Sequence, residues 1–381
     1  MTKIVDRGSN ADIFYLDFAK AFDKVSHKLL LVKLQAKGIE GKLLAWISDW
    51  LLGRTQRVKV GRENSDCSDV DSGIPQGTVL GPPLFIIYID DLDDAVIELD
   101  LIMKFADDTK GMQEIKSEED RQKLQRTLDK LVEWATKWSM EFNVKKCKIV
   151  HVGHRNPGYK YVLNGEELQE AEEEEDIGRL VHKSLKPSKQ CHKAAATASV
   201  VLRQITKNFH YRDRRTFRNL YCQYIRPHLE FSTPAWSPWT AADIEVLEKV
   251  QRRAVSMMVG LVGATYDEKC LEANLEKLTV RRQKADLIQV FKYIHARDQT
   301  VTEEFFEKVT VGGIATRQNS DPLNLKIPRT RLDIRKYGFT SRVVQDWNAL
   351  DPEIKNKRTL HQFKQSLNLI YRRPVGGAAA E

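Results

Sequence analysis

The spacing of apolar positions divides the chain near residue 190. In the first part, short apolar runs predict strands at about residues 12–17, 101–106 and 147–152, and amphipathic stretches predict helices at 28–37, 43–52, 79–88 and 117–138. The last of these helices places Leu124, Leu128, Leu131, Trp134 and Ala135 on one side, which is typical of a buried face. Strands and helices in this order predict an α+β unit built on a ferredoxin-like antiparallel sheet.

Residues 156–190 are expected to connect this unit to a second one. Residues 161–168 predict a hairpin, because the Asn164-Gly165 dipeptide favours the left-handed backbone of a tight hairpin turn. The acidic run 172–176 indicates a solvated loop or a sheet edge.

From residue 191 onward the pattern is helical. We expect helices over 194–209, 214–225, 241–261 and 278–295, with a break at Pro227 because proline lacks the backbone donor. Residues 300–335 are expected to be rich in loops, and 376–381 to be disordered. The last two helices carry basic residues beside an apolar stripe: Lys249, Arg252, Arg253, Arg281 and Arg282. Such a face meets either solvent or phosphate, and the pattern does not decide between them.

Charge separates the two halves in the same way. Residues 1–185 carry 27 basic and 33 acidic residues, whereas residues 186–381 carry 34 and 20, so the net charge changes from −6 to +14. An acidic region followed by a basic one is typical of enzymes that handle nucleic acid. Five scattered cysteines without a Cys-x-x-Cys pair predict a reducing compartment, nuclear or cytoplasmic. No apolar run suits a membrane span or a signal peptide, so no membrane partner is expected.

Two of the predicted strands lead into carboxylates. Asp17 follows the apolar run 13–16, and Asp107-Asp108 follow 101–106, with residues 109–111 expected as a tight turn behind them. Adjacent carboxylates raise each other's pKa, and a divalent cation removes that repulsion. Carboxylate oxygens suit Mg²⁺, and two such ions can clamp both oxygens of a phosphoryl displacement. Asp-Asp pairs are also common at surface turns, so this pattern needs further support.

Four ordered motifs provide that support. They are residues 15–25 (YLDFAKAFDKV), 73–77 (GIPQG), 105–109 (FADDT) and 138–148 (WSMEFNVKKCK). Together they resemble the reverse transcriptase family, specifically the enzymes of non-LTR (LINE-type) retrotransposons of the jockey and chicken-repeat kind. Residues 224–230 and 347–350 are similar to the thumb and tail of the same enzymes. The resemblance implies a polymerase palm over 1–155, a hairpin and acidic linker over 156–190, a helical thumb-like region over 191–300 and a tail over 301–381.

The resemblance also implies residue roles. Asp17, Asp107 and Asp108, with the backbone carbonyl of Phe18, are expected to hold two Mg²⁺ ions, for which Mn²⁺ can substitute. The remaining roles are a sugar gate for Phe22, contact with the templating base pair for Gln76 and Gly77, protonation of pyrophosphate for Lys146, and contact with the product duplex for Lys249, Arg252, Arg253, Arg281 and Arg282. Phe22 also suits an ordinary core position. Lys145 and Lys148 flank Lys146, so a basic strand edge would look similar.

Two other patterns are set aside. Residues 88–91 (YIDD) look superficially like the tyrosine-containing motif of retroviral polymerases, but they follow an apolar helix and continue in acid, which indicates a solvated helix end. Cys147, His151 and His154 lie close together, yet no Cys-x-x-Cys accompanies them and their alternation is that of a strand, which argues against zinc.

The expected function is that of an RNA-directed DNA polymerase, with an RNA template, a DNA primer and dNTPs as partners. The family places its fingers upstream of the first motif, and only sixteen residues precede Asp17. We therefore expect a palm-and-thumb fragment, with retroelement RNA and a separate endonuclease or fingers-bearing segment as further partners. The alternative is a catalytically inactive nucleic-acid-binding fragment. An RNA-directed RNA polymerase is disfavoured by Phe22.

Overall fold

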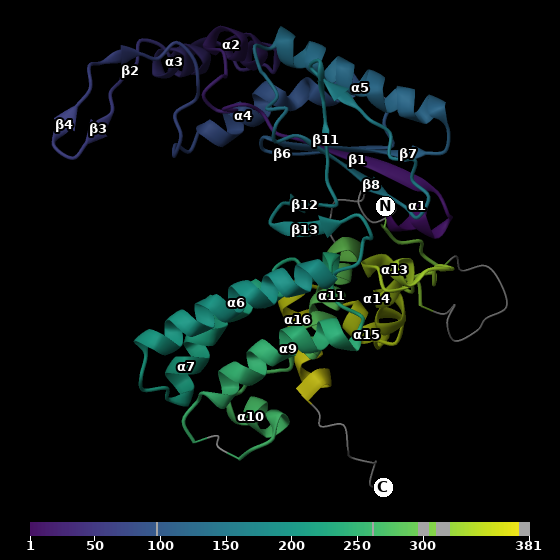
Figure 1. Cartoon of the computed structure of the whole chain (residues 1–381). Coiled ribbons are helices and arrows are strands. Elements are labelled where there is room, and N and C mark those ends of the chain that lie inside the picture. The colour runs from purple at the N-terminus through teal and green to yellow at the C-terminus, as the bar shows by residue number, and fades with distance from the viewer. Residues whose placement is uncertain (97, 261–262, 296–304, 310–320, 373–381) are drawn as a thin grey trace. The chain divides into compact units, whose positions relative to one another are not determined.

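The computed structural model describes residues 1–96, 98–260, 263–295, 305–309 and 321–372 (Figure 1). The chain divides into two compact units, one over residues 3–174 and the other from residue 175 onward. The first unit combines helices with a sheet and the second is mostly helical, so the predicted α+β class is confirmed.

A five-stranded sheet lies at the centre of the first unit, in the order β11-β8-β1-β7-β6. Its strands are β1 (Asn10–Leu16), β6 (Leu101–Phe105), β7 (Asp108–Ile115), β8 (Lys148–Val152) and β11 (Gln169–Glu170). β1 pairs antiparallel with β7 on one side and with β8 on the other, while β11 runs parallel to β8. The three predicted strands are therefore confirmed to within two residues.

Helices cover one face of this sheet (Figure 1). The helices before residue 174 are α1 (Thr2–Asp6), α2 (His27–Ala36), α3 (Gly41–Leu51), α4 (Gly81–Ile89), the 3₁₀ helix η1 (Asp90–Val96) and α5 (Glu118–Lys137). Phe14, Leu16 and Ile149 of the sheet share one core with residues of α2, α4 and α5. The predicted core positions on α5, from Leu124 to Ala135, are all buried. The amphipathic pattern therefore identified the packed face of the helix correctly.

Four short pairs of strands accompany the central sheet. They are β2 (Thr55–Gln56) with β5 (Ser68–Asp69), β3 (Lys59–Val60) with β4 (Glu63–Asn64), β9 (Val162–Leu163) with β10 (Glu166–Glu167), and β12 (Glu173–Asp176) with β13 (Arg179–His182). Between β9 and β10, Asn164 and Gly165 have φ of +52° and +81°. This is the predicted turn, since both central residues of a type I′ turn need positive φ.

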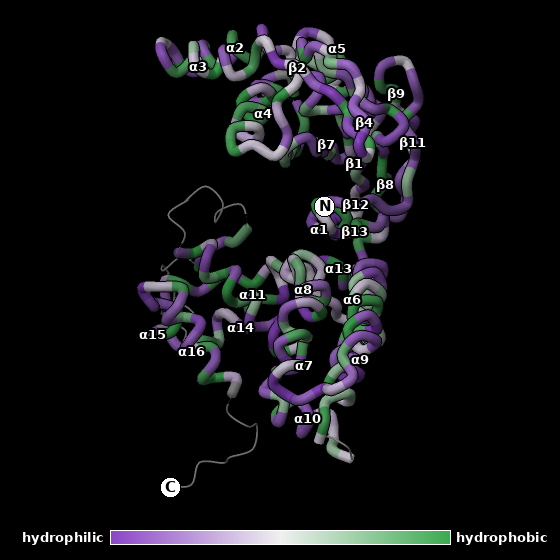
Figure 2. The backbone as a smooth tube through the Cα atoms, turned by 90° about the vertical axis from the view of Figure 1, so that its left-hand side faces the viewer, coloured by the Kyte–Doolittle hydropathy of each residue, from purple (hydrophilic) through white to green (hydrophobic). Residues whose placement is uncertain are grey.

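The second unit is built from helices with two separate cores. Its elements are α6 (Ser188–Asn208), α7 (Arg214–Leu220), the π-helix η2 (Tyr221–Ile225), α8 (Arg226–Glu230), η3 (Thr233–Ala235), α9 (Ala241–Ser256), α10 (Tyr266–Glu272), α11 (Leu278–His295), α13 (Asp333–Lys336), α14 (Phe339–Asn348), α15 (Pro352–Lys355) and α16 (Leu360–Arg372). One core includes Leu202 of α6 and Leu247 of α9, and the other includes Phe291 of α11 and Trp347 of α14. Hydrophobic and hydrophilic residues alternate along α6 and α9, as expected of amphipathic helices (Figure 2).

The expected helix break at Pro227 is wrong. Helical backbone continues from Arg214 to Glu230, with the π-helical turn η2 immediately before α8. Pro227 lies in the first turn of α8, where its missing N–H requires no partner. The helix α9 ends at Ser256, earlier than predicted. Residues 296–304, 310–320 and 373–381 lie outside the described residues, and with them part of the expected loop-rich stretch and the predicted disordered end.

We predict that Gly111→Ala destabilises the first unit strongly. Gly111 of β7 pairs with Phe14 of β1, and an added Cβ would lie 2.2 Å from Cζ of the Phe14 ring. Such overpacking typically costs about 1–3 kcal/mol in the free energy of unfolding. Denaturant unfolding measures this loss. The control is the double variant Phe14→Leu/Gly111→Ala, compared with Phe14→Leu. If Gly111→Ala lowers the free energy of unfolding by the same amount in the wild-type and Phe14→Leu backgrounds, the proposed clash is contradicted.

Candidate active site

The predicted carboxylates Asp107 and Asp108 lie at a tight hairpin between β6 and β7. Phe105 pairs with Asp108, so Ala106 and Asp107 form a two-residue turn. Ala106 has φ of +52°, a left-handed conformation that costs an L-residue about 1–2 kcal/mol. The expected turn over residues 109–111 is wrong, because these residues are held inside β7 by pairing with β1. The carboxylates therefore occupy the turn itself and the first residue of β7.

The register between β1 and β7 brings the first motif to the same place. Leu16 is paired with Thr109, so Asp17 directly follows the last pair and Asp108 directly precedes it. In an antiparallel pair, residues at matching positions are neighbours on the same face. Asp107 is partly buried and Asp108 is exposed. Asp17, Asp107 and Asp108 thus lie at one end of two adjacent strands, which come from segments ninety residues apart.

Asp17 is held by the segment that contains the fourth motif. Its Oδ2 lies 3.2 Å from Nζ of Lys146, forming an ion pair, and this oxygen is buried without a well-aligned hydrogen bond. The backbone N–H of Asp17 donates to Sγ of Cys147 at 3.4 Å, and its carbonyl accepts from the Asn143 N–H at 2.8 Å. Burial raises the pKa of the Cys147 thiol to about 11, so the thiol is neutral at physiological pH. Among the described residues Lys145, Lys146 and Lys148, Lys146 is the one that pairs with Asp17.

The donor set of this sheet end fits a hard divalent cation. Asp17, Asp107 and Asp108 supply carboxylate oxygens, the ligand type that Mg²⁺ prefers, and Oδ2 of Asp17 is a buried oxygen that lacks a hydrogen bond. Within the described ranges, however, no three His, Cys, Asp or Glu side chains converge as a metal-binding group. The ammonium group of Lys146 is the cation next to Asp17 in this structure.

The glycine-rich second motif is tied to the residues that follow Asp17. The N–H groups of Gly73 and Ile74 donate to the carbonyls of Val25 and Phe22, at 2.8 and 2.9 Å. Gly73 has φ of +92°, and a Cβ there would lie 2.9 Å from the carbonyl oxygen of Asp23, which explains the glycine. The loop then presents Gln76 and Gly77, both exposed. The side chain of Gln76 donates to Oδ1 of Asp23 at 3.4 Å.

Phe22 is fixed against the core of the first unit. Its ring stacks on Phe85 of α4, with centroids 4.6 Å apart and an interplanar angle of 19°. Phe85 is fully buried, whereas Phe22 is only partly buried. One side of the Phe22 ring is therefore packed against a fully buried core residue.

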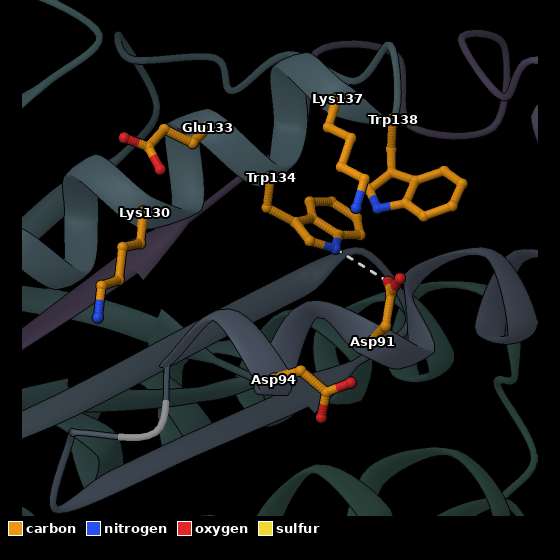
Figure 3. A pocket seen from close by; sticks show the side chains of 7 residues that line it. All are labelled: Asp91, Asp94, Lys130, Glu133, Trp134, Lys137 and Trp138. Carbon is orange, nitrogen blue, oxygen red and sulfur yellow. Dashed lines mark hydrogen bonds between the residues drawn. The ribbon is translucent and has the colours of Figure 1, made fainter.

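The acidic run that was set aside has structural partners. Asp91 accepts hydrogen bonds from Nζ of Lys33 at 2.6 Å and from Nε1 of Trp134 at 2.9 Å, and Asp90 pairs with Lys37. Figure 3 shows Asp91 beside Trp134 in a pocket of about 520 Å³ between η1 and α5. The pocket is lined by Asp91, Asp94, Lys130, Glu133, Trp134, Lys137 and Trp138. None of the residues predicted as catalytic, substrate-binding or metal-binding lines this pocket.

Comparison with known families decides the identity of the first unit. The family model described as reverse transcriptase (RNA-dependent DNA polymerase) matches residues 3–195, just over half of the chain. The chain belongs to the reverse transcriptase family. The matched residues include the four motifs identified in the sequence.

Relatives of this reverse transcriptase family member include retrotransposon proteins. This chain is 34% identical over 161 residues to the RNA-directed DNA polymerase from mobile element jockey of Drosophila melanogaster. The match covers 40% of this chain and 17% of that protein. The chain is 24% identical over 260 residues to the probable RNA-directed DNA polymerase from transposon X-element of the same species, covering 65% and 28%. The chain thus spans less than a third of these relatives' length. A solved telomerase from Candida albicans, in complex with a fragment of telomeric RNA, gives a TM-score of 0.39 at 11% identity, covering 66% of this chain and 48% of that one.

The basic residues predicted to contact the product duplex differ in their exposure and in their ion pairs. Lys249, Arg252 and Arg253 lie on the exposed side of α9, although Arg252 pairs with Glu245. Arg281 on α11 forms a two-pronged ion pair with Glu230. Arg282 is only 4% exposed and lies 4.0 Å from Glu248, so it is not presented to a ligand at the surface. The expectation for Arg282 therefore does not agree with its position, because burial took precedence over the helical pattern.

Three contacts in and beside this site were not predicted from the sequence. Cys147 was considered only as a zinc ligand, yet its thiol bonds the backbone of Asp17, while His151 bonds Asp12 at 2.7 Å. Asn143 bonds the Asp17 carbonyl. The available signal was that Asn143 and Cys147 both belong to the fourth motif, close to Lys146.

Among the described helices, none is long and apolar enough to cross a lipid bilayer.

Proposed function

We propose that this chain is the polymerase portion of a non-LTR retrotransposon reverse transcriptase, which adds dNTPs to a primer 3′-OH on an RNA template. The observation that carries the proposal is the β1–β7 register, which supports a single carboxylate edge formed by Asp17, Asp107 and Asp108. Family membership and the retrotransposon relatives support the same reaction class. The activity, template and partners of the longer relatives extend to this chain only as part of this proposal.

In this mechanism, Asp17, Asp107 and Asp108, with the Phe18 carbonyl, would hold two Mg²⁺ or Mn²⁺ ions. Such ions would supply activation of the attacking 3′-oxygen and neutralisation of charge on the transferred phosphoryl group and on the pyrophosphate leaving group. The chain's own residues orient the substrates. Phe22, supported by Phe85, closes on the sugar, and the loop with Gln76 and Gly77 approaches the nascent base pair, because glycine allows close backbone contact.

Lys146 is proposed to carry the proton that pyrophosphate receives. A general acid must be protonated and positioned near the leaving group. The ion pair between Nζ of Lys146 and Oδ2 of Asp17 supports the second requirement, since it places the lysine beside a carboxylate of the proposed metal-binding edge. In the described part of the chain, Asp17 pairs with Lys146 and not with the adjacent Lys145.

We predict that Lys146→Met lowers the rate of nucleotide incorporation about a hundredfold, in the range by which a general acid accelerates a reaction. Lys145→Met is the matched control, because it removes the same charge one residue away. Single-turnover incorporation on an RNA template measures both rates. Equal losses of incorporation rate in the two variants would show that only positive charge in this segment matters, and would contradict a general-acid role for Lys146.

The proposed function is tested by Mg²⁺-dependent primer extension with the purified chain on an RNA template. Extension that requires the metal and prefers dNTPs is expected. If the chain binds primer–template in a salt-sensitive manner yet never extends it, the inactive nucleic-acid-binding fragment is the correct description. The exposed cations Lys249, Arg252 and Arg253 on α9 are the residues proposed to bind phosphate in either case.

A further inference from the structure

Cys147 lies directly behind Asp17, where the pairing of β1 ends. The last pair between β1 and β8 joins Tyr15 to Lys148, so the backbone of Asp17 is beyond the regular sheet. Its N–H donates instead to Sγ of Cys147 at 3.4 Å, and the same sulfur lies 3.8 Å from its carbonyl oxygen. The side chain of Cys147 thus replaces the missing strand partner at this residue.

The turn that carries Cys147 also fixes the residues after Asp17. The Asn143 N–H donates to the Asp17 carbonyl and the Ala19 N–H donates to the Glu141 carbonyl, both at 2.8 Å. Phe18 lies between these two bonds, and its ring stacks on Phe142 with centroids 4.6 Å apart. The backbone is therefore held on both sides of Phe18 by the segment 141–147.

The turn itself is closed by its own backbone bonds. The N–H groups of Lys146 and Cys147 both donate to the Asn143 carbonyl, at 2.9 and 3.1 Å. Cys147 is fully buried, so its Sγ cannot be replaced by water as a partner for the Asp17 N–H. A small displacement of this sulfur would move the peptide of Asp17 with it.

We propose that Cys147 is a positioning residue, whose thiol aligns the Asp17 peptide so that the Asp17 carboxylate and the Phe18 carbonyl reach the metal-binding edge together. This inference rests on the proposed function for the identity of the edge. It goes beyond that function because the thiol contacts the Asp17 backbone and is not one of the proposed metal ligands. Its contribution is geometric, in the way that outer partners of metal ligands orient the ligands.

A purely space-filling role for Cys147 makes a different prediction. Valine fills nearly the same volume but leaves the partly buried Asp17 N–H without the Sγ acceptor, whereas serine supplies an acceptor oxygen. If the thiol only packs, valine is the better replacement. If it positions Asp17, serine is the better replacement.

The experiment compares Cys147→Val and Cys147→Ser with a control, Cys191→Val. Cys191 is likewise fully buried, but it lies on α6 in the second unit. Mn²⁺ binding is measured by electron paramagnetic resonance without nucleic acid, with Asp17→Asn defining the part of the binding that belongs to the edge. Thermal unfolding and kcat and KM for dNTP incorporation are measured on the same proteins.

We expect Cys147→Val to weaken Mn²⁺ binding at the edge and to lower kcat, each about tenfold, because the Asp17 N–H loses its hydrogen-bond acceptor. Cys147→Ser should recover most of both quantities, and Cys191→Val should change neither. Wild-type Mn²⁺ affinity and kcat in a folded Cys147→Val protein would overturn the proposal. The proposal would also be overturned if the losses of Mn²⁺ affinity and kcat in the valine and serine variants simply paralleled their losses of thermal stability.

The same measurements separate this inference from the proposed function. If the wild-type chain shows no primer extension, the polymerase proposal fails, but the Mn²⁺ comparison among the Cys147 variants still decides the positioning role. If extension is normal and Mn²⁺ affinity does not depend on residue 147, only the positioning role is rejected.

Discussion

Replacing Asp107 and Asp108 together with alanine is expected to lower primer extension at least about a thousandfold, because the metal ions proposed for this edge would stabilise the transition state by several kcal/mol. Both residues belong to the hairpin between β6 and β7, and Asp17 meets them across the β1–β7 register. Removing two of the three carboxylates leaves Asp17 unable to hold two cations. Mg²⁺-dependent extension on an RNA template, followed at saturating dNTP, measures the loss.

The control for this experiment is Asp90→Ala/Asp91→Ala, which removes a second Asp-Asp pair from the same unit. Asp90 and Asp91 pair with Lys37 and Lys33, so this variant is expected to lose stability while retaining extension once corrected for folded protein. A result in which the control is inactive and the Asp107/Asp108 variant extends primers would reverse the assignment of the catalytic pair. Primer–template binding by all variants should remain salt-sensitive, because no phosphate-binding residue has been changed.

Phe22→Ala is expected to relax discrimination against ribonucleotides about ten- to a hundredfold. The Phe22 ring stacks on Phe85, and the backbone carbonyl of Phe22 accepts a hydrogen bond from the Ile74 N–H. Because both the ring and the backbone are held, we expect the ring not to move aside for a 2′-hydroxyl. Steric rejection of a single added hydroxyl reaches about a hundredfold in apolar pockets. The ratio of kcat/KM for dNTP to that for rNTP, measured for each base on one template, gives the discrimination directly.

Phe22→Leu is the matched control for this variant, since it keeps most of the bulk and should keep most of the discrimination. An unchanged ratio in Phe22→Ala would return Phe22 to the role of a core aromatic stacked on Phe85. Discrimination that is absent already in the wild-type chain would instead favour an RNA-directed RNA polymerase, the alternative that Phe22 disfavours.

The helices and strands were mostly predictable, because their signals are local. α11 was predicted with its observed bounds, and the Asn164-Gly165 turn was predicted with its backbone conformation. The core face of α5 followed from helical spacing alone. Where a competing tertiary interaction was present, the local signal failed. Pro227 was accommodated at the start of a helix, and residues 109–111 were drawn into β7 by pairing with β1.

The sequence by itself determined the family, the order of the four motifs and the chemical type of the candidate ligands, since residue identity and short-range spacing carry that information. Only the tertiary structure decided which of these residues meet. Asp17 and Cys147 are 130 positions apart, and no periodicity records that one bonds the other. The burial of Arg282 and the pairing of Lys146, in preference to Lys145, with Asp17 likewise depend on long-range packing. Contacts between distant segments are selected by the whole fold, because each is stabilised only after the sheet that brings the segments together has formed.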